Sequence, residues 1–213
     1  MKAYFISGLA AGKDIFKYIV LPERYTPIYI DWITPLPGES LNDYAIRLIN
    51  KIDRTEPFLL IGLSMGGMLA VEMAKHSSPE QVIIISSIPS SAHLPGYYRK
   101  MAGIGLHQFI PIAFFQFASI IKRFFTKESP EDKKNLKEMI RHSDPVFIKW
   151  ALLAVLNWEN DNIPNNLIHI HGTSDGVLPG HLTNPTHFIK GGGHLMVMTR
   201  ANEINEILSG ILL

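Results

Sequence analysis

The residues that are most able to take part in a chemical reaction surround a serine flanked by glycines. Gly62-Leu63-Ser64-Met65-Gly66 follows the apolar run 58–61 and precedes helix-forming residues that extend to Lys75. This order predicts a strand, a sharp turn and a helix, with the Ser64 hydroxyl exposed at the turn. Glycines suit such a turn because its crowded backbone leaves little room for neighbouring side chains. The alternative interpretation is a glycine-rich turn in which Ser64 only caps the helix.

A serine hydroxyl becomes a good nucleophile only when a base removes its proton, and a carboxylate must hold that base in one tautomer. Among nine histidines, His194 is the best candidate because it follows three consecutive glycines, after a predicted strand and before the last predicted helix. His181 and His187 remain alternatives. Three other histidines, His76, His107 and His142, are interpreted as solvated. Two more, His169 and His171, are interpreted as structural.

For the carboxylate, Asp175 follows the predicted strand that ends at His171, which places it at the same sheet edge as Ser64. An aspartate followed by glycine is also common in simple Asx turns. Asp31 follows another predicted strand and is the main rival. Two further aspartates lie in the long segment between the predicted strands or at its exit: Asp144 and Asp161.

The elements around these residues alternate between short apolar strands and helical segments. Strands that are apolar throughout indicate an α/β fold with a mostly parallel sheet of about six strands, covered by helices on both faces. The predicted helices begin near residue 14, at the N-cap Ser40, after Ser64, and at Leu195, where the last one continues to Leu213. The predicted strands are 3–6, 27–30, 58–61, 81–87, 166–172 and 186–190.

The alternation is interrupted between about residues 88 and 164. This segment is rich in aromatic residues, notably in 109–125, and its helical patches carry apolar side chains on more than one face. We therefore predict a helical cap over the serine, inserted at 88–164 into a core formed by 1–87 and 165–213. The alternative is a set of ordinary core helices. Such a cap could seal the site or pair with a second subunit as a homodimer.

Composition excludes several classes of function. The 213-residue chain has a formal net charge of +1 and 46% hydrophobic residues, so charge gives no reason to expect nucleic acid as a partner. The absence of cysteine excludes disulfides, thiolate metal sites and a cysteine nucleophile. No segment approaches the ~20 apolar residues of a membrane span. The N-terminus reads better as a first strand than as a signal peptide, so we expect a cytoplasmic protein.

The chain order Ser64, Asp175, His194 matches the Ser…Asp…His order of one fold. With this order, the sequence resembles the α/β-hydrolase superfamily over essentially its whole length. The resemblance implies a catalytic triad of these residues, with no metal or organic cofactor. It also implies an oxyanion hole formed by the backbone N–H groups of Met65 and Leu9. The matching segments are Gly8-Leu9, Gly62–Gly67, His171–Asp175 and Gly193-His194.

Three features depart from the pattern of this superfamily. Ser7-Gly8 stands where many members have His-Gly, so Ser7 could either replace the hydrogen bonds of that histidine within the loop or leave the loop looser. The two N-terminal antiparallel strands of the full fold are absent. The interval between Asp175 and His194 holds only one predicted strand, so the helix expected there must be short or missing.

The resemblance implies acyl transfer to water through an acyl-serine intermediate. The apolar cap favours a small, largely apolar carboxylic ester as substrate, and a carboxylesterase as the enzyme. A thioester or a carbon–carbon bond could be cleaved by the same three residues. A serine nucleophile argues against a dehalogenase of this fold, in which an aspartate attacks. A ligand receptor without catalytic activity is the competing hypothesis from another class.

Overall fold

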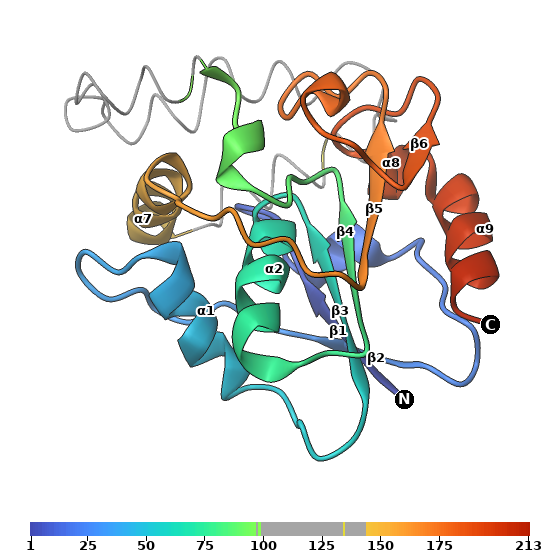
Figure 1. Ribbon diagram of the computed structural model, residues 1–213, viewed down its shortest axis with the longest axis horizontal. Helices are drawn as coiled ribbons and strands as arrows, with labels where there is room; N and C mark the ends of the chain where they lie inside the picture. The colour runs from blue at the N-terminus through green and yellow to red at the C-terminus, as the bar shows by residue number, and fades with distance from the viewer. Residues whose placement is uncertain (97, 99–133, 135–143) are drawn as a thin grey trace.

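The protein contains a six-stranded, all-parallel sheet with the strand order β2-β1-β3-β4-β5-β6 (Figure 1). The computed structural model describes residues 1–96, 98, 134 and 144–213. The predicted α/β fold class, with about six strands, is confirmed. The strands are β1 (Lys2–Ile6), β2 (Thr26–Tyr29), β3 (Phe58–Leu63), β4 (Gln81–Ile85), β5 (Leu167–Gly172) and β6 (His187–Ile189).

Helices cover both faces of this sheet, as Figure 1 shows. Three α-helices lie on one face: α1 (Leu41–Ile49), α2 (Met65–Ser77) and α7 (Pro145–Leu156). The other face is covered by the 3-10 helix η1 (Lys13–Phe16) and by α8 (Met196–Thr199) and α9 (Ala201–Ile211). In the described part of the chain, no helix is both long and apolar enough to cross a membrane.

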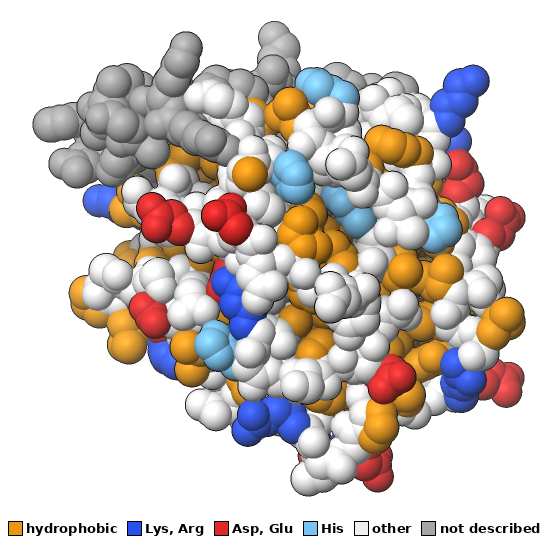
Figure 2. All heavy atoms as spheres, viewed as in Figure 1, with side chains coloured by type: hydrophobic (Ala, Val, Ile, Leu, Met, Phe, Trp, Pro, Cys, Tyr) orange, Lys and Arg blue, Asp and Glu red, His pale blue; other side chains and the backbone are white. Residues whose placement is uncertain are grey.

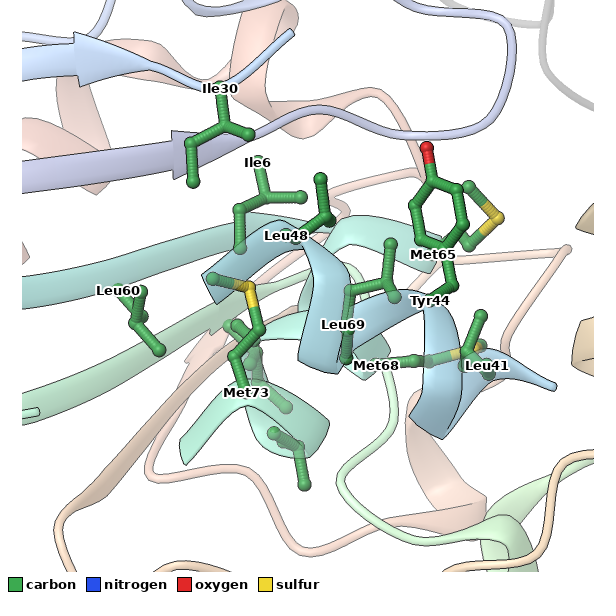
Figure 3. Close-up of a cluster of buried hydrophobic side chains, with 14 of the residues drawn as sticks. Ile6, Ile30, Leu41, Tyr44, Leu48, Leu60, Met65, Met68, Leu69 and Met73 are labelled. Carbon is green, nitrogen blue, oxygen red and sulfur yellow. The ribbon is translucent and has the colours of Figure 1, made fainter. Parts of the chain in front are cut away.

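The core beneath α1 and α2 is built from side chains that point off one face of the sheet. Figure 3 shows Ile6 and Leu60 of the sheet facing Leu48 of α1 and Met73 of α2. Helix α1 begins at the predicted N-cap, where the Ser40 hydroxyl accepts a hydrogen bond from the backbone N–H of residue 43 at 3.1 Å. Each fully buried aliphatic side chain contributes about 1.5–3 kcal/mol, so this layer fixes the strand ends that carry the site.

The opposite face of the sheet has its own core. Successive residues of a strand point to opposite faces, so Phe5 and Ile61 pack away from α2 and toward α9. On α9, Ile204 and Leu208 are fully buried against this layer. The strands are therefore apolar on both faces, which explains the continuous apolar runs in the sequence.

Some boundaries differ from those predicted. The expected helix 195–213 is two helices, because Arg200 has φ −136° and ψ 29°, which is not a helical conformation. The first predicted helix is only the 3-10 turn η1. Strand β5 ends at Gly172, as the predicted strand 166–172 does, and His171 lies within it.

Within the predicted cap, the structure describes the α-helix α7 and the 3-10 helix η2 (Ser91–His93). Helix α7 lies within 88–164 and packs beside α1, where the rings of Tyr44 and Trp150 are 4.3 Å apart between centroids. The Trp150 indole N–H donates to the Glu39 carbonyl at 2.8 Å. Farther along, the Trp158 indole N–H donates to the Glu72 carboxylate at 2.7 Å. Most of the predicted cap lies outside the described residues, namely residues 97, 99–133 and 135–143. The domain boundaries and a homodimer formed through the cap therefore remain predictions.

Candidate active site

Ser64 occupies a sharp turn between β3 and α2. Its φ of 52° and ψ of −121° lie in a region that a residue with a side chain rarely adopts. The flanking glycines allow this turn to pack. A Cβ on Gly66 would collide with the carbonyl oxygens of Ile6 and Ser7, and one on Gly62 would collide with the Gly66 carbonyl. The local sequence therefore dictates the turn that was predicted from it.

Hydrogen bonds fix the Ser64 backbone from the neighbouring strand. Its N–H donates to the Ile85 carbonyl of β4 at 3.0 Å. Its carbonyl accepts from the Ser87 hydroxyl at 2.7 Å and from the Gly67 N–H at 2.9 Å. These contacts hold the serine at the carboxyl end of the parallel strands, the edge at which ligands bind in sheets of this kind.

His194 and Asp175 lie on two loops that are tied together. The Ser174 N–H donates to the Gly192 carbonyl at 2.9 Å, and the Gly191 N–H donates to the Thr173 hydroxyl at 2.8 Å. Gly172 and Gly192 approach so closely that a Cβ on Gly172 would overlap the Gly192 carbonyl. The short interval between Asp175 and His194 holds β6 and only the 3-10 turn η4 (Gly180–Leu182).

The structure brings Ser64, His194 and Asp175 into one chain of hydrogen-bonding distances. His194 Nε2 is 2.9 Å from Ser64 Oγ, and His194 Nδ1 is 2.8 Å from Asp175 Oδ2. The imidazole and the carboxylate are both buried. With a hydrogen on Nδ1 donating to the carboxylate, Nε2 presents a lone pair to the serine hydroxyl, which is the tautomer a base requires.

The buried Asp175 carboxylate remains ionised because its neighbours stabilise the negative charge. Its Oδ1 accepts from the backbone N–H groups of Val177 at 2.8 Å and Leu178 at 2.9 Å. Burial alone would raise the pKa of this carboxyl. The facing His194, the side-chain N–H groups of His171 and His194 and the Leu178 N–H outweigh burial and hold the pKa well below its usual range.

His171 is a neighbour of this carboxylate that sequence analysis interpreted as structural. Its Nε2 is 3.3 Å from Asp175 Oδ2, the same oxygen that His194 Nδ1 approaches at 2.8 Å. The signal that could have revealed it is a pair of histidines at alternate positions, 169 and 171, in an otherwise apolar strand. Alternate residues of a strand share one face, so the two imidazoles were bound to be neighbours.

The first loop lies directly against Ser64. A Cβ on Gly8 would be 3.4 Å from the Ser64 Cβ. The loop is a tight turn, closed by a hydrogen bond from the Ala11 N–H to the Gly8 carbonyl at 3.0 Å. The Ser7 hydroxyl donates to the Ala11 carbonyl at 2.7 Å, which is a bracing contact of the kind that the sequence suggested for it. The Leu9 N–H lies within this turn and takes no part in its closing bond.

The rival residues lie elsewhere. Asp31 is exposed and follows the edge strand β2, on the opposite side of Ser64 from β5. Asp144 is exposed and accepts from the Val146 N–H at 2.8 Å, as the N-cap of α7. His181 and Asp161 are exposed and His187 is partly buried. Asp175 and Ser64, in contrast, both lie at hydrogen-bonding distance from His194.

The surroundings of the site contain both imidazoles and apolar side chains. Figure 2 shows histidine and hydrophobic side chains next to each other on the visible face, over the upper parts of β4 and β5. Within residues 1–96 and 144–213, no three His, Cys, Asp or Glu side chains are arranged to hold a metal ion. The chemistry available from the described groups is proton transfer and nucleophilic attack.

Comparison with known families agrees with this geometry. Residues 4–207 match the sequence model of the Alpha/beta hydrolase family. This chain belongs to the α/β-hydrolase family. That membership supports a hydrolase, and it confirms the resemblance inferred from the sequence motifs. No curated protein gives a significant match to the chain.

Many solved structures share the fold at low sequence identity. Est816, described as an N-acyl homoserine lactone degrading enzyme, is 19% identical with a TM-score of 0.76, covering 99% of this chain and 92% of its own. MenH from S. aureus is 15% identical with a TM-score of 0.74, covering 100% and 93%. An esterase from Exiguobacterium antarcticum is 17% identical with a TM-score of 0.71, covering 98% and 90%. These similarities establish the fold.

Proposed function

We propose that this α/β-hydrolase is a serine hydrolase that cleaves a small, largely apolar carboxylic ester through an acyl-serine intermediate. The observation that carries the proposal is the continuous series of contacts from Ser64 Oγ through His194 to Asp175 Oδ2, with separations of 2.9 and 2.8 Å. A buried base between a hydroxyl and an ionised carboxylate is the arrangement that nucleophilic acyl transfer requires.

In the proposed reaction, His194 Nε2 removes the proton of Ser64 as the oxygen attacks the ester carbonyl carbon. The imidazolium that forms is stabilised by the Asp175 carboxylate at Nδ1, and it then donates its proton to the leaving alkoxide. Water enters, His194 takes one of its protons, and hydroxide attack on the acyl-serine releases the acid. The final proton transfer returns hydrogen to Ser64 Oγ, so the enzyme is regenerated.

The negative charge that develops on the carbonyl oxygen needs hydrogen-bond donors placed in advance. Met65 is the first residue of α2, and the first N–H groups of a helix have no partner within it. The Leu9 N–H lies in the turn that packs against Ser64. We assign these two amides to the oxyanion hole, where one donor is worth about 3–4 kcal/mol of barrier lowering.

An apolar ester is supported by the side chains at the carboxyl edge of the sheet. Leu9, Trp32 and Val177 are only partly buried and pack against the core cluster beneath the helices α1 and α2. The Trp32 indole N–H donates to the Ala11 carbonyl at 3.2 Å, which places its ring beside the first loop. Apolar side chains of this kind next to Ser64 favour an apolar acyl or alcohol group. The aromatic residues of the predicted cap, outside the described residues, agree with this preference by composition.

The test is hydrolysis of p-nitrophenyl acetate and butyrate by the wild type and by Ser64→Ala. We expect kcat to fall by at least about 10⁴-fold in the variant, because the nucleophile is gone. Ser209→Ala, an exposed serine on α9, is the matched control and should retain full activity. Circular dichroism checks that both variants fold.

Two outcomes would contradict the proposal. One is a wild type with neither turnover nor covalent labelling by a fluorophosphonate, which would favour a receptor without catalytic activity. The other is full activity in Ser64→Ala, which would move the nucleophile elsewhere. A panel of esters and acyl-CoA thioesters with graded acyl chains then separates an esterase from a thioesterase, since the same triad could serve both.

A further inference from the structure

A second chain of imidazoles, formed by His169 and His171, also reaches the Asp175 carboxylate. His169 Nε2 is 2.8 Å from His171 Nδ1, and both rings are almost fully buried on the same face of β5. His171 Nε2 is 2.7 Å from the Leu178 carbonyl and 3.3 Å from Asp175 Oδ2. The Thr183 hydroxyl is 3.4 Å from His169 Nδ1 at the far end of this chain.

The hydrogen positions in this chain follow from the acceptors. His171 Nε2 faces a carbonyl oxygen and a carboxylate oxygen, both of which can only accept, so Nε2 must carry the hydrogen. In a neutral His171 the remaining nitrogen, Nδ1, is then an acceptor, and His169 must donate to it from Nε2. His169 Nδ1 in turn accepts from the Thr183 hydroxyl. In this arrangement the Thr183 hydroxyl donates to His169, His169 donates to His171, and His171 donates toward the Leu178 carbonyl and Asp175. The Ser87 carbonyl also faces the His169 ring.

Aliphatic residues at positions 169 and 171 would pack in β5 without any need for hydrogen bonds. Ile168 and Ile170 alternate with the two histidines in β5, and the neighbouring strand β4 carries Val82 and three isoleucines at its buried positions. A buried polar group is costly unless its hydrogen bonds are satisfied, so aliphatic residues would suit a strand that serves packing alone. Two buried imidazoles at alternate positions of one strand indicate a task that aliphatic side chains cannot perform.

We propose that His171 is a positioning residue for the Asp175 carboxylate, and that His169 holds His171 in the tautomer that donates toward it. The inference rests on the proposed serine-hydrolase function. His171 and His194 bond the same oxygen, Oδ2, while Oδ1 is held by the Val177 and Leu178 amides. The shared Nε2–H also ties the Leu178 carbonyl to the strand. His171 thus fixes both the carboxylate and the loop that carries it.

The first measurement uses the wild-type protein and needs no variant. Long-range ¹H–¹⁵N correlation spectra report which nitrogen of each imidazole carries a hydrogen. We expect the Nε2–H tautomer for His171 and His169, and a downfield Nδ1–H signal for His194 from its bond to the carboxylate. An Nδ1–H tautomer of His171 would overturn the proposal. This result does not depend on catalysis, so it stands apart from any failure of the proposed function.

The second measurement compares His171→Leu with His171→Gln, whose amide N–H can replace the lost donor. Loss of positioning should lower kcat for p-nitrophenyl butyrate by about 10²-fold in His171→Leu, with KM nearly unchanged, and shift the His194 Nδ1–H signal. His171→Gln should recover most of kcat and of the signal. His181→Gln, an exposed histidine, is the matched control and should behave as the wild type.

The outcomes separate positioning from simple packing. Equal loss of kcat in His171→Leu and His171→Gln, or kcat within about twofold of the wild type in both, would contradict the proposal. If His171→Leu fails to fold by circular dichroism, the wild-type tautomers and the His171→Gln kinetics still decide. A wild type that shows no turnover would count against the proposed hydrolase, while the tautomers would still report the contact with Asp175.

Discussion

Two carboxylates are completely buried in the described part of this protein, and they are satisfied in different ways. The Glu72 side chain, on α2, is paired with the Lys75 ammonium at 2.8 Å and accepts from the Trp158 indole. Asp175 is surrounded by imidazole and backbone N–H groups, and within residues 1–96 and 144–213 no lysine or arginine forms an ion pair with it. Both side chains are 0% exposed.

The difference indicates separate tasks. A lysine next to Glu72 balances its charge permanently, so that group can only hold α2 and the segment around Trp158 together. The donors around Asp175 leave a net negative charge, which is worth most when His194 becomes positive. A buried anion without a permanent counter-ion is therefore the one suited to catalysis.

The largest effect expected from this comparison is on turnover. Asp175→Asn should lower kcat by about 10⁴-fold while the protein stays folded, because an amide can donate to His194 Nδ1 and so stabilise the wrong tautomer. Steady-state kinetics with p-nitrophenyl butyrate and a thermal unfolding curve measure the two quantities. Loss of less than about tenfold would mean that Asp175 is no more involved in the reaction than Glu72.

The opposite pattern is expected at Glu72. Lys75→Met should lower the free energy of unfolding by about 3 kcal/mol, because it leaves a buried carboxylate without its cation, and kcat should stay within about twofold. Urea titration followed by circular dichroism measures the stability. Glu72→Gln should cost less, about 1–2 kcal/mol, since Lys75 is partly exposed and can be rehydrated. Loss of turnover in either variant would contradict the view that Glu72, unlike Asp175, affects only stability.

The smallest expected effect is a pH dependence of the free energy of unfolding, and it arises from His169. Burial, with His171 and His93 nearby, lowers the pKa of His169 to about 3, although the Ser87 carbonyl opposes this shift. Thr183 is the other polar group facing the ring. Below pH ~6.5 the unfolded chain takes up a proton that the folded protein does not. Stability should therefore be full above that pH and fall by about 1.4 kcal/mol per unit as pH drops toward 3.

Urea unfolding at pH 7, 6 and 5 measures this slope. His169→Gln should reduce it, since glutamine does not titrate, whereas Lys75→Met should leave it intact. The same slope in the wild type and in His169→Gln would show that another group is responsible.

Much of the site could be predicted because its signals are local. The turn at Ser64 follows from an apolar strand, glycines that fit a crowded backbone and a helix, all within about twenty residues of sequence. The carboxyl ends of parallel strands share one edge, so Asp175 and His194 were expected near Ser64 once the strands were recognised. The geometry agrees with that expectation.

The contacts that were missed depend on long loops closing against each other. The His171 bond to Asp175 requires the turn after β5 to fold back on its own strand, which no spacing rule specifies. The tie between Glu72 and Trp158 joins residues separated by 86 positions. The break at Arg200 lies in the non-helical backbone conformation of that residue, between two apolar segments that share one core. Hydrophobic pattern alone cannot distinguish these from a continuous helix.

The positive φ of Ser64 has a consequence for the evolution and engineering of this chain. Ala10, Ser64 and Ser86, with φ of 60°, 52° and 47°, follow β1, β3 and β4, so three left-handed residues other than glycine gather at one edge of the sheet. Glycine would relax each of them. A selection for thermal stability alone would therefore favour glycine at position 64, and the resulting protein would lack the proposed nucleophile.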